Sequence, residues 1–97
     1  MSRRVLRKIR HAIRTGNYDF THHAIDEMVE DGLGIMDVEH VLLTGALCKT
    51  EEDDPRGPRH TIIGIATDQE TEVGVVGRFT ETDTYLLVTV YEVTELR

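Results

Sequence analysis

The stretch YLLVTVYEV, residues 85–93, decides the fold class of this 97-residue chain. Its residues are nearly all β-branched, aromatic or aliphatic. Leu87, Thr89 and Tyr91 alternate with Leu86, Val88, Val90 and Glu92, which is the period of two that a strand requires. Three shorter segments with strand character precede it, at residues 46–50, 60–66 and 73–79, and turn residues separate them. The C-terminal half therefore predicts an antiparallel sheet of about four strands over residues 46–93. Because this strand is the strongest and the last, we expect it to leave an exposed edge that pairs with a second copy or a partner.

The N-terminal half has the apolar period of helices instead. We expect a basic helix over about residues 3–15, then helices over about 21–31 and 36–44, with Thr21 as the N-cap of the second. A short extended segment, Tyr18 to Thr21, links the first two. The apolar positions predicted to face the core are Val5, Leu6, Ile9, Ala12 and Ile13 in the first helix, Ala24, Ile25, Met28 and Val29 in the second, and Val38, Val41 and Leu42 in the third. The order predicts one α+β domain, residues 1–97, with N-terminal helices packed on one face of a C-terminal antiparallel sheet.

Charge is divided unevenly along the chain, whose net charge is −7. Residues 1–14 carry six Arg and Lys and no acid, and all 18 Asp and Glu follow. The basic segment either contacts nucleic acid or is the solvated face of a helix that packs on its own acidic domain. No apolar run is long enough for a membrane helix, and no apolar segment follows the basic N-terminus as in a secretory signal. With the single Cys48, these features predict a cytoplasmic protein that does not contact membranes.

Two adjacent histidines open the second predicted helix. His22 lies one turn from Asp26 and His23 one turn from Glu27, so either ring could be oriented by a carboxylate or could ligate a metal with it. A zinc site needs three or four ligands, and His60 is the only other well-placed imidazole, so we expect no metal and no cofactor. The alternatives are an acid–base histidine and a structural one that caps the helix or bridges helix and sheet.

A second group of candidate residues surrounds the loop before the second strand. Prolines and a glycine stiffen Pro55-Arg56-Gly57-Pro58-Arg59-His60, and a stiff loop with two arginines suits a phosphate, although the arginines could simply balance the acids at 51–54. Cleavage of RNA without metal needs a base for the ribose 2′-hydroxyl, cations for the phosphate and an acid for the leaving oxygen. The candidates for acid–base catalysis are His23, Lys49, His60 and Tyr91, and those for phosphate binding are Arg56, Arg59 and Arg78.

Several short motifs together resemble a small family of uncharacterised bacterial domains. They are Thr21-His22-His23-Ala24 with Met28, Gly32-Leu33, Asp37-Val38-Glu39, Pro58-Arg59-His60 and the final Val88-Thr89-Val90-Tyr91-Glu92. Genes of that family often lie beside antitoxins with a YgiT-type zinc finger. The layout is also similar to the toxin MqsR, which has the RelE-like fold, and Lys49 falls where that toxin has an active-site lysine.

The resemblance implies a RelE/MqsR-like fold and a toxin of a type II toxin–antitoxin system, acting as a metal-independent mRNA endoribonuclease. It implies an antitoxin protein and RNA as partners. The alternative is a non-catalytic binding module on the same fold, because the chain is acidic where such toxins are basic and has no counterpart of the toxin's catalytic tyrosine. A third hypothesis is a metal-dependent enzyme that uses His22, His23, Glu27 and His60.

Overall fold

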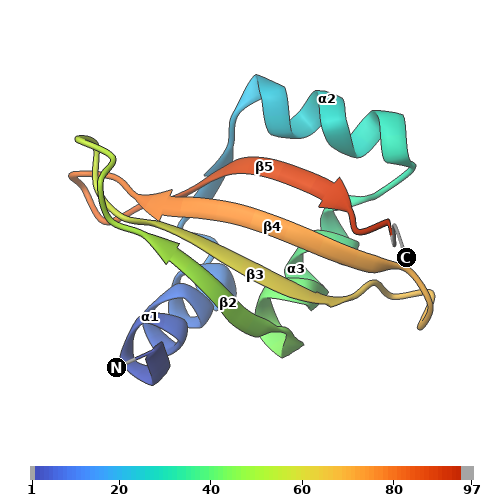
Figure 1. Cartoon of the computed structure of the whole chain (residues 1–97), viewed down its shortest axis with the longest axis horizontal. Helices are drawn as coiled ribbons and strands as arrows, with labels where there is room; N and C mark the ends of the chain where they lie inside the picture. The colour runs from blue at the N-terminus through green and yellow to red at the C-terminus, as the bar shows by residue number, and fades with distance from the viewer. Residues whose placement is uncertain (1, 95–97) are drawn as a thin grey trace.

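The computed structural model describes residues 2–94, which form a layered α+β structure (Figure 1). The elements follow in the order α1 (Ser2–Arg14), β1 (Tyr18–Phe20), α2 (His22–Asp31), α3 (Ile35–Thr44), β2 (Ala46–Glu51), β3 (Arg59–Ile65), β4 (Glu72–Phe79) and β5 (Tyr85–Glu92). The three helices and the four C-terminal strands thus lie where the sequence predicts them. The hydroxyl oxygen of Thr21 accepts a hydrogen bond from the Ala24 amide at 3.0 Å, which confirms Thr21 as the N-cap of α2.

The sheet differs from the prediction in strand number and direction. It has five strands in the order β1-β5-β4-β3-β2, because the short extended segment at Tyr18–Phe20 joins it. β1 pairs in parallel with β5, with Tyr18 opposite Tyr85, whereas all other neighbours are antiparallel. The sheet is therefore mixed, and the helices do not all precede the first strand. A three-residue segment gives too little alternation to reveal strand pairing from sequence alone.

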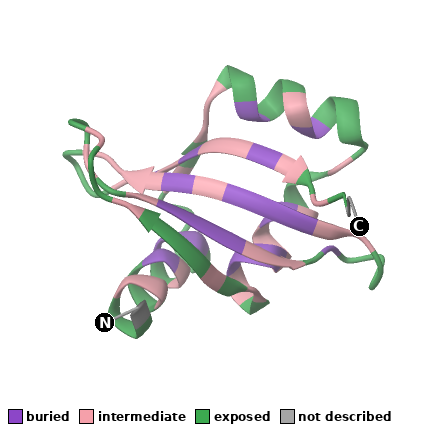
Figure 2. Ribbon diagram, viewed as in Figure 1, coloured by how far each residue is buried: buried purple, intermediate pink, exposed green. Residues whose placement is uncertain are grey.

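Helices α1 and α3 cover one face of the sheet and enclose the core there (Figures 1 and 2). Most of the predicted apolar positions of both helices are confirmed, since Ile9, Ala12 and Ile13 of α1 and Val38, Val41 and Leu42 of α3 are buried. The other two predicted positions of α1, Val5 and Leu6, are partly buried and pack against the core. Arg10 joins the two helices: its guanidinium donates to the Leu42 and Gly45 carbonyl oxygens at 3.0 and 2.7 Å, where α3 ends. A cation suits that position, because the last carbonyls of a helix lack intrahelical partners and carry negative partial charge.

Helix α2 does not lie on that face but runs beside the outer edge of β5, beyond the end of β1. The Glu27 carboxylate accepts a hydrogen bond from the Val90 amide at 2.9 Å, and the Asp31 carboxylate accepts one from the Glu92 amide at 3.2 Å. These amides are two residues apart, as the outward-facing amides of an edge strand must be. The expected open edge on the final strand is therefore wrong: β5 lies between β1 and β4, and α2 closes the rest of its edge. Within residues 2–94, the strand with an unpaired outer edge at the other side of the sheet is β2.

The contacts of α2 with β5 also correct the predicted inward face of this helix. Ala24 and Met28 are buried as predicted, but Ile25 is 46% exposed and Val29 is 75% exposed. On a helix these two residues lie on the opposite side of the buried pair from Glu27 and Asp31. The hydrogen bonds to β5 thus fix a rotation of α2 that turns Ile25 and Val29 toward solvent. No helix within residues 2–94 is both long and apolar enough to cross a membrane.

Candidate functional site

The face of the sheet opposite α1 and α3 carries no helix within residues 2–94 (Figure 1). Residues paired across neighbouring strands point to the same face, so the register identifies its rows. Lys49, Thr61, Val76 and Thr89 form one row across β2, β3, β4 and β5. The adjacent row begins with Glu51 opposite Arg59, and the pairing of His60 with Gly77 places Arg78 next to Arg59. Three cations from three strands therefore share one end of the uncovered face.

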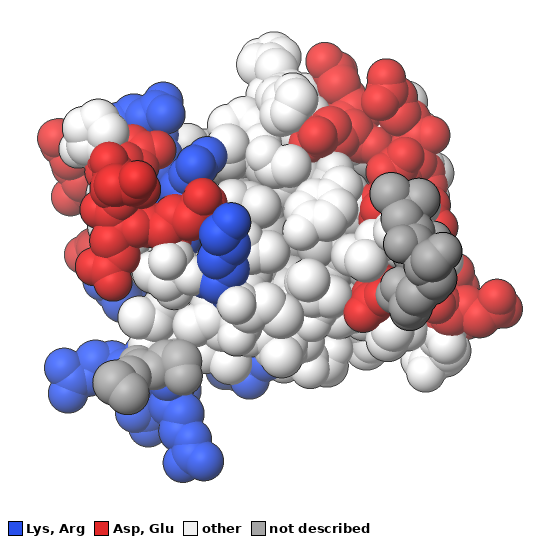
Figure 3. All heavy atoms as spheres, viewed as in Figure 1, with Lys and Arg blue, Asp and Glu red and all other residues white. Residues whose placement is uncertain are grey.

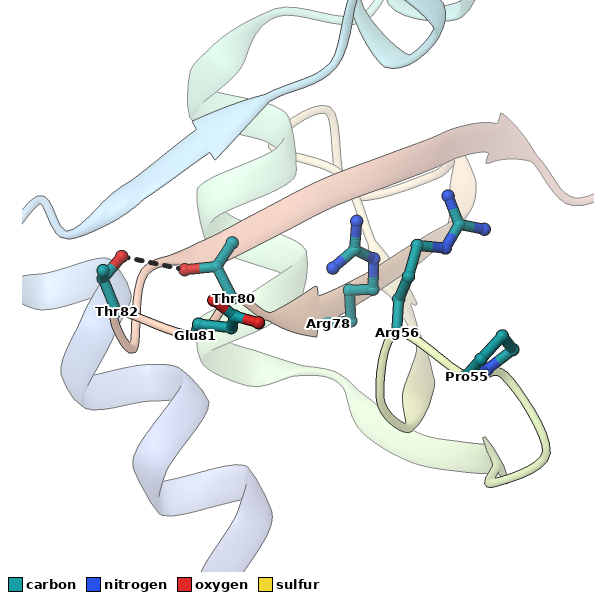
Figure 4. A pocket seen from close by; sticks show the side chains of 6 residues that line it. All are labelled: Pro55, Arg56, Arg78, Thr80, Glu81 and Thr82. Carbon is teal, nitrogen blue, oxygen red and sulfur yellow. Dashed lines mark hydrogen bonds between the residues drawn. The ribbon is translucent and has the colours of Figure 1, made fainter.

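A cleft of about 500 Å³ opens beside this group, between the β2–β3 loop and the β4–β5 turn (Figure 4). Its walls are formed by Pro55 and Arg56 of the loop and by Arg78, Thr80, Glu81 and Thr82 at the end of β4 and in the turn. Figure 4 shows the Arg56 and Arg78 side chains next to each other, with their guanidinium groups pointing the same way. The two threonine hydroxyls are 3.1 Å apart. The sequence proposed both arginines as phosphate ligands, and the structure brings them together.

Asp54 holds the loop that carries Arg56. Its carboxylate accepts a hydrogen bond from the Arg56 amide at 2.9 Å and contacts the Arg56 guanidinium at 3.3 Å, while its carbonyl oxygen accepts from the Gly57 amide. These hydrogen bonds, with the backbone amide first, hold the pKa of Asp54 below its usual value, so it stays ionised at neutral pH. Gly57 has φ +116, a conformation that residues with a Cβ rarely adopt. The loop is therefore pre-shaped, and part of the charge of Arg56 is already balanced.

Arg59 and Lys49 are held by acids of the same loop and strand. Arg59 lies 3.5 Å from a Glu51 oxygen and 3.6 Å from an Asp54 oxygen, and Lys49 lies 3.6 Å from the other Glu51 oxygen. The Arg59 Nε is buried and makes no hydrogen bond within residues 2–94. The interpretation of Arg56 and Arg59 as charge balance for the acids at 51–54 is thus supported in part. Arg78 differs, because it makes no ion pair or side-chain hydrogen bond among the described residues.

The cleft contains chemistry that the sequence interpretation missed. Arginines and hydroxyls can bind the oxygens of a phosphodiester, and the Glu81 carboxylate beside them can accept a proton. Thr80, Glu81 and Thr82 follow Arg78 directly, so the only local signal was a polar turn after a cationic strand residue. Such a turn is ordinary in a hairpin, and only its approach to the β2–β3 loop makes it part of a site.

Tyr91 shares the uncovered face with Arg78 but lies far along it. Tyr91 pairs with Gly74, and a Cβ at Gly74 would lie 2.3 Å from the tyrosine ring, so the ring lies across that glycine. Gly74 is four residues before Arg78 on β4, which corresponds to about 13 Å along a strand. The tyrosine hydroxyl is therefore outside the cleft.

His60 lies on the other face of the sheet, in the core. It is 5% exposed, its Nδ1 is 3.3 Å from the hydroxyl oxygen of Tyr85, and its ring stacks on the Tyr85 ring. Burial is the main cause that lowers its pKa, against the opposing effects of a hydrogen bond with Gly77 and the charge of Glu52. Because Arg59 and His60 are consecutive in β3, they point to opposite faces. The structure does not bring His60 to the cleft.

His23 is also remote from the cleft, on the exposed side of α2. Its side chain is 67% exposed, and its Nε2 lies 3.2 Å from Glu27. The structural role that was the alternative for a histidine, a bridge between helix and sheet, belongs to Glu27, which accepts a hydrogen bond from the Val90 amide. Within residues 2–94, no group of three or more His, Cys, Asp or Glu side chains is placed to hold a metal ion. His22, His23, Glu27 and His60 therefore do not form a shared metal site.

The charges around the cleft are mixed, while the centre of the uncovered face has none. Figure 3 shows basic and acidic side chains together at the end of the loops, an uncharged middle, and acidic side chains alone at the opposite end. A polyanion would therefore be attracted only at the end that carries Arg56 and Arg78 and repelled at the other. This polarity favours one orientation of any anionic ligand on the face.

The comparisons with known proteins identify a family and nothing finer. The family model described as a domain of unknown function, DUF4258, matches residues 20–92, which is most of the chain. The chain therefore belongs to that family, consistent with the resemblance to uncharacterised domains. The comparison with curated proteins and the comparison with solved structures found no match.

Proposed function

We propose that this DUF4258 chain is a toxin-like endoribonuclease of a type II toxin–antitoxin system, which binds RNA at the Arg56–Arg78 cleft and cleaves it without a metal ion. The observation that carries the proposal is the pair of neighbouring guanidinium groups at a cleft of about 500 Å³, with Arg78 unpaired among the described residues. A guanidinium presents several donors in a fork that matches two phosphate oxygens. The proposal includes a RelE/MqsR-like arrangement, in which the uncovered sheet face carries the site.

The residues at this end of the face suit an internal transfer reaction. Glu81 would take the proton of a ribose 2′-hydroxyl, whose oxygen then attacks the adjacent phosphorus. Arg56 and Arg78 would stabilise the negative charge that develops on the phosphate oxygens. The bond from phosphorus to the 5′-oxygen breaks, and the exposed Lys49 ammonium would give that oxygen its proton. The expected products are a 2′,3′-cyclic phosphate and a 5′-hydroxyl.

The test is cleavage of an end-labelled single-stranded RNA, either free in the presence of EDTA or bound to ribosomes in a magnesium buffer. We expect Arg78→Ala to lower the cleavage rate on the order of 100-fold, because one charged donor to the transition state is lost. We expect Glu81→Gln to lower it by a similar factor. The matched control is Arg14→Ala, an exposed arginine of α1 outside the cleft, which should cleave at the wild-type rate. The proposal would be refuted if neither the free RNA nor the ribosome-bound RNA gave a cyclic-phosphate product.

A second candidate function is RNA binding without cleavage at the same cleft. Two observations favour it: His23 and His60 are remote from the cleft, and Asp54 already balances part of the charge of Arg56. Binding to two phosphates of single-stranded RNA would give a log–log salt slope of about −1.4. Binding with that slope, abolished by Arg78→Ala and accompanied by no product, would favour this candidate over the nuclease.

A further inference from the structure

Four of the five large apolar side chains that the described residues expose lie in one helical pair. They are Ile25 at 46% and Val29 at 75% on α2, and Ile35 at 53% and Met36 at 73% at the start of α3. Single exposed apolar residues are normal, whereas these four fall within twelve positions on two consecutive helices. We call Ile25, Val29, Ile35 and Met36 the α2–α3 apolar surface.

The segment that carries this surface is acidic. Residues 15–48 contain seven Asp and Glu and no Lys or Arg. Asp26 and Glu30 are exposed on α2 beside Val29, and the last turn of α2 contains no basic residue. Acids in the last turn oppose the helix dipole, and Glu30 makes no ion pair or side-chain hydrogen bond within residues 2–94. A cation brought by a binding partner would remove this unfavourable charge arrangement.

We propose that the α2–α3 apolar surface binds a basic amphipathic helix of a partner protein, one that presents apolar residues on one side with lysines or arginines along its edges. The apolar side would cover Val29 and Met36, and the flanking cations would meet Asp26 and Glu30. RNA and anionic lipid are unsuited to this place, because both carry phosphates that the acids repel. A basic amphipathic helix would cover the exposed apolar side chains and pair with the acidic side chains at the same time.

A second copy of this chain is the less suitable occupant. Among residues 2–94 the one basic helix is α1, and α1 buries its apolar residues Ile9, Ala12 and Ile13 in its own core. A second copy could therefore bring arginines to Glu30 but no apolar face to Val29. The inference does not rest on RNA cleavage, since the surface and the cleft share no residue.

The experiment uses the full chain and a fluorescein-labelled 18-residue peptide of leucine, alanine and lysine, arranged as an amphipathic helix. A scrambled peptide of the same composition has the same charge but no apolar face. By fluorescence anisotropy, we expect the amphipathic peptide to bind at least ten times more tightly than the scrambled one. We expect Val29→Ser combined with Met36→Ser to weaken this binding at least tenfold. Glu30→Gln should weaken it severalfold and reduce its dependence on salt.

The matched control is Ile65→Ser, because Ile65 is the fifth exposed large apolar residue, 40% exposed, and lies at the end of β3 outside the surface. It should bind the peptide like wild type, as should Arg78→Ala in the cleft, which separates this inference from the proposed function. Equal thermal midpoints would show that the surface variants are folded. The proposal is overturned by wild-type affinity in the double variant, by equal loss in Ile65→Ser, or by light scattering that shows self-association abolished by the double variant.

Discussion

The hydrogen bond from the Val90 amide to Glu27 gives the sharpest stability prediction. Val90 is fully buried, and the Glu27 side chain is 24% exposed, so replacing Glu27 by Ala leaves a poorly solvated amide without an acceptor. A hydrogen bond to a charged group contributes about 1.5–3 kcal/mol, and partial exposure favours the lower half of that range. The contact with His23 adds at most about 0.5 kcal/mol, because the histidine is largely exposed. We therefore expect Glu27→Ala to lower the free energy of unfolding by about 2 kcal/mol.

Urea denaturation followed by circular dichroism measures this change, and for a domain of this size it corresponds to a thermal midpoint lower by about 8–16 °C. Glu27→Gln keeps an acceptor for the Val90 amide, so it should lose less than about 1 kcal/mol. Asp26→Ala, next to it on the exposed side of α2, should change stability by no more than about 0.5 kcal/mol. Faster hydrogen exchange of the Val90 amide in Glu27→Ala would show that the loss of stability arises at this hydrogen bond. Equal stability of Glu27→Ala and Asp26→Ala would refute the interpretation of α2 as the cover of the β5 edge.

Two further predictions concern the buried ring cluster. Burial holds the pKa of His60 in the folded protein below its usual 6.5, so the unfolded chain binds a proton at His60 more readily. The free energy of unfolding is therefore greatest above pH 6.5 and falls as the pH drops toward the pKa of His60 in the folded protein. Urea midpoints at pH 7.5 and 5.5 should show this fall in wild type and a smaller one in His60→Phe, and an equal fall in both would assign it elsewhere. Gly77→Ala would place a Cβ 2.5 Å from the fully buried Tyr85 ring, which also packs on Phe79, so we expect a loss of about 2–3 kcal/mol in the same assay. A stable Gly77→Ala protein would mean that the ring can move aside.

The candidate site was predictable only in part. Arg56 and Arg78 were predicted as phosphate ligands from a stiff loop and a cationic strand position, which are local features, and the structure places both at one cleft. Glu81 was missed because a polar turn carries no signal of its neighbours. His23 and His60 were proposed because imidazoles can act as acids and bases, but the fold places both away from the cleft. His60 is buried on the core face against Tyr85, and His23 faces solvent on α2.

The sequence by itself determined the helices, the four C-terminal strands and most of the core, because apolar periodicity, caps and turn residues act over a few neighbouring residues. Ile9, Val38 and Leu42 are buried as their spacing predicts. Only the tertiary structure decided that Tyr18–Phe20 pairs with β5 and that α2 closes the edge of that strand, because these contacts join residues more than sixty positions apart. The hydrogen bonds from β5 to Glu27 and Asp31 set the rotation of α2, which leaves Val29 exposed although its position in the sequence predicts burial. It is also the packing of two distant turns, rather than any motif, that places Arg56 beside Arg78.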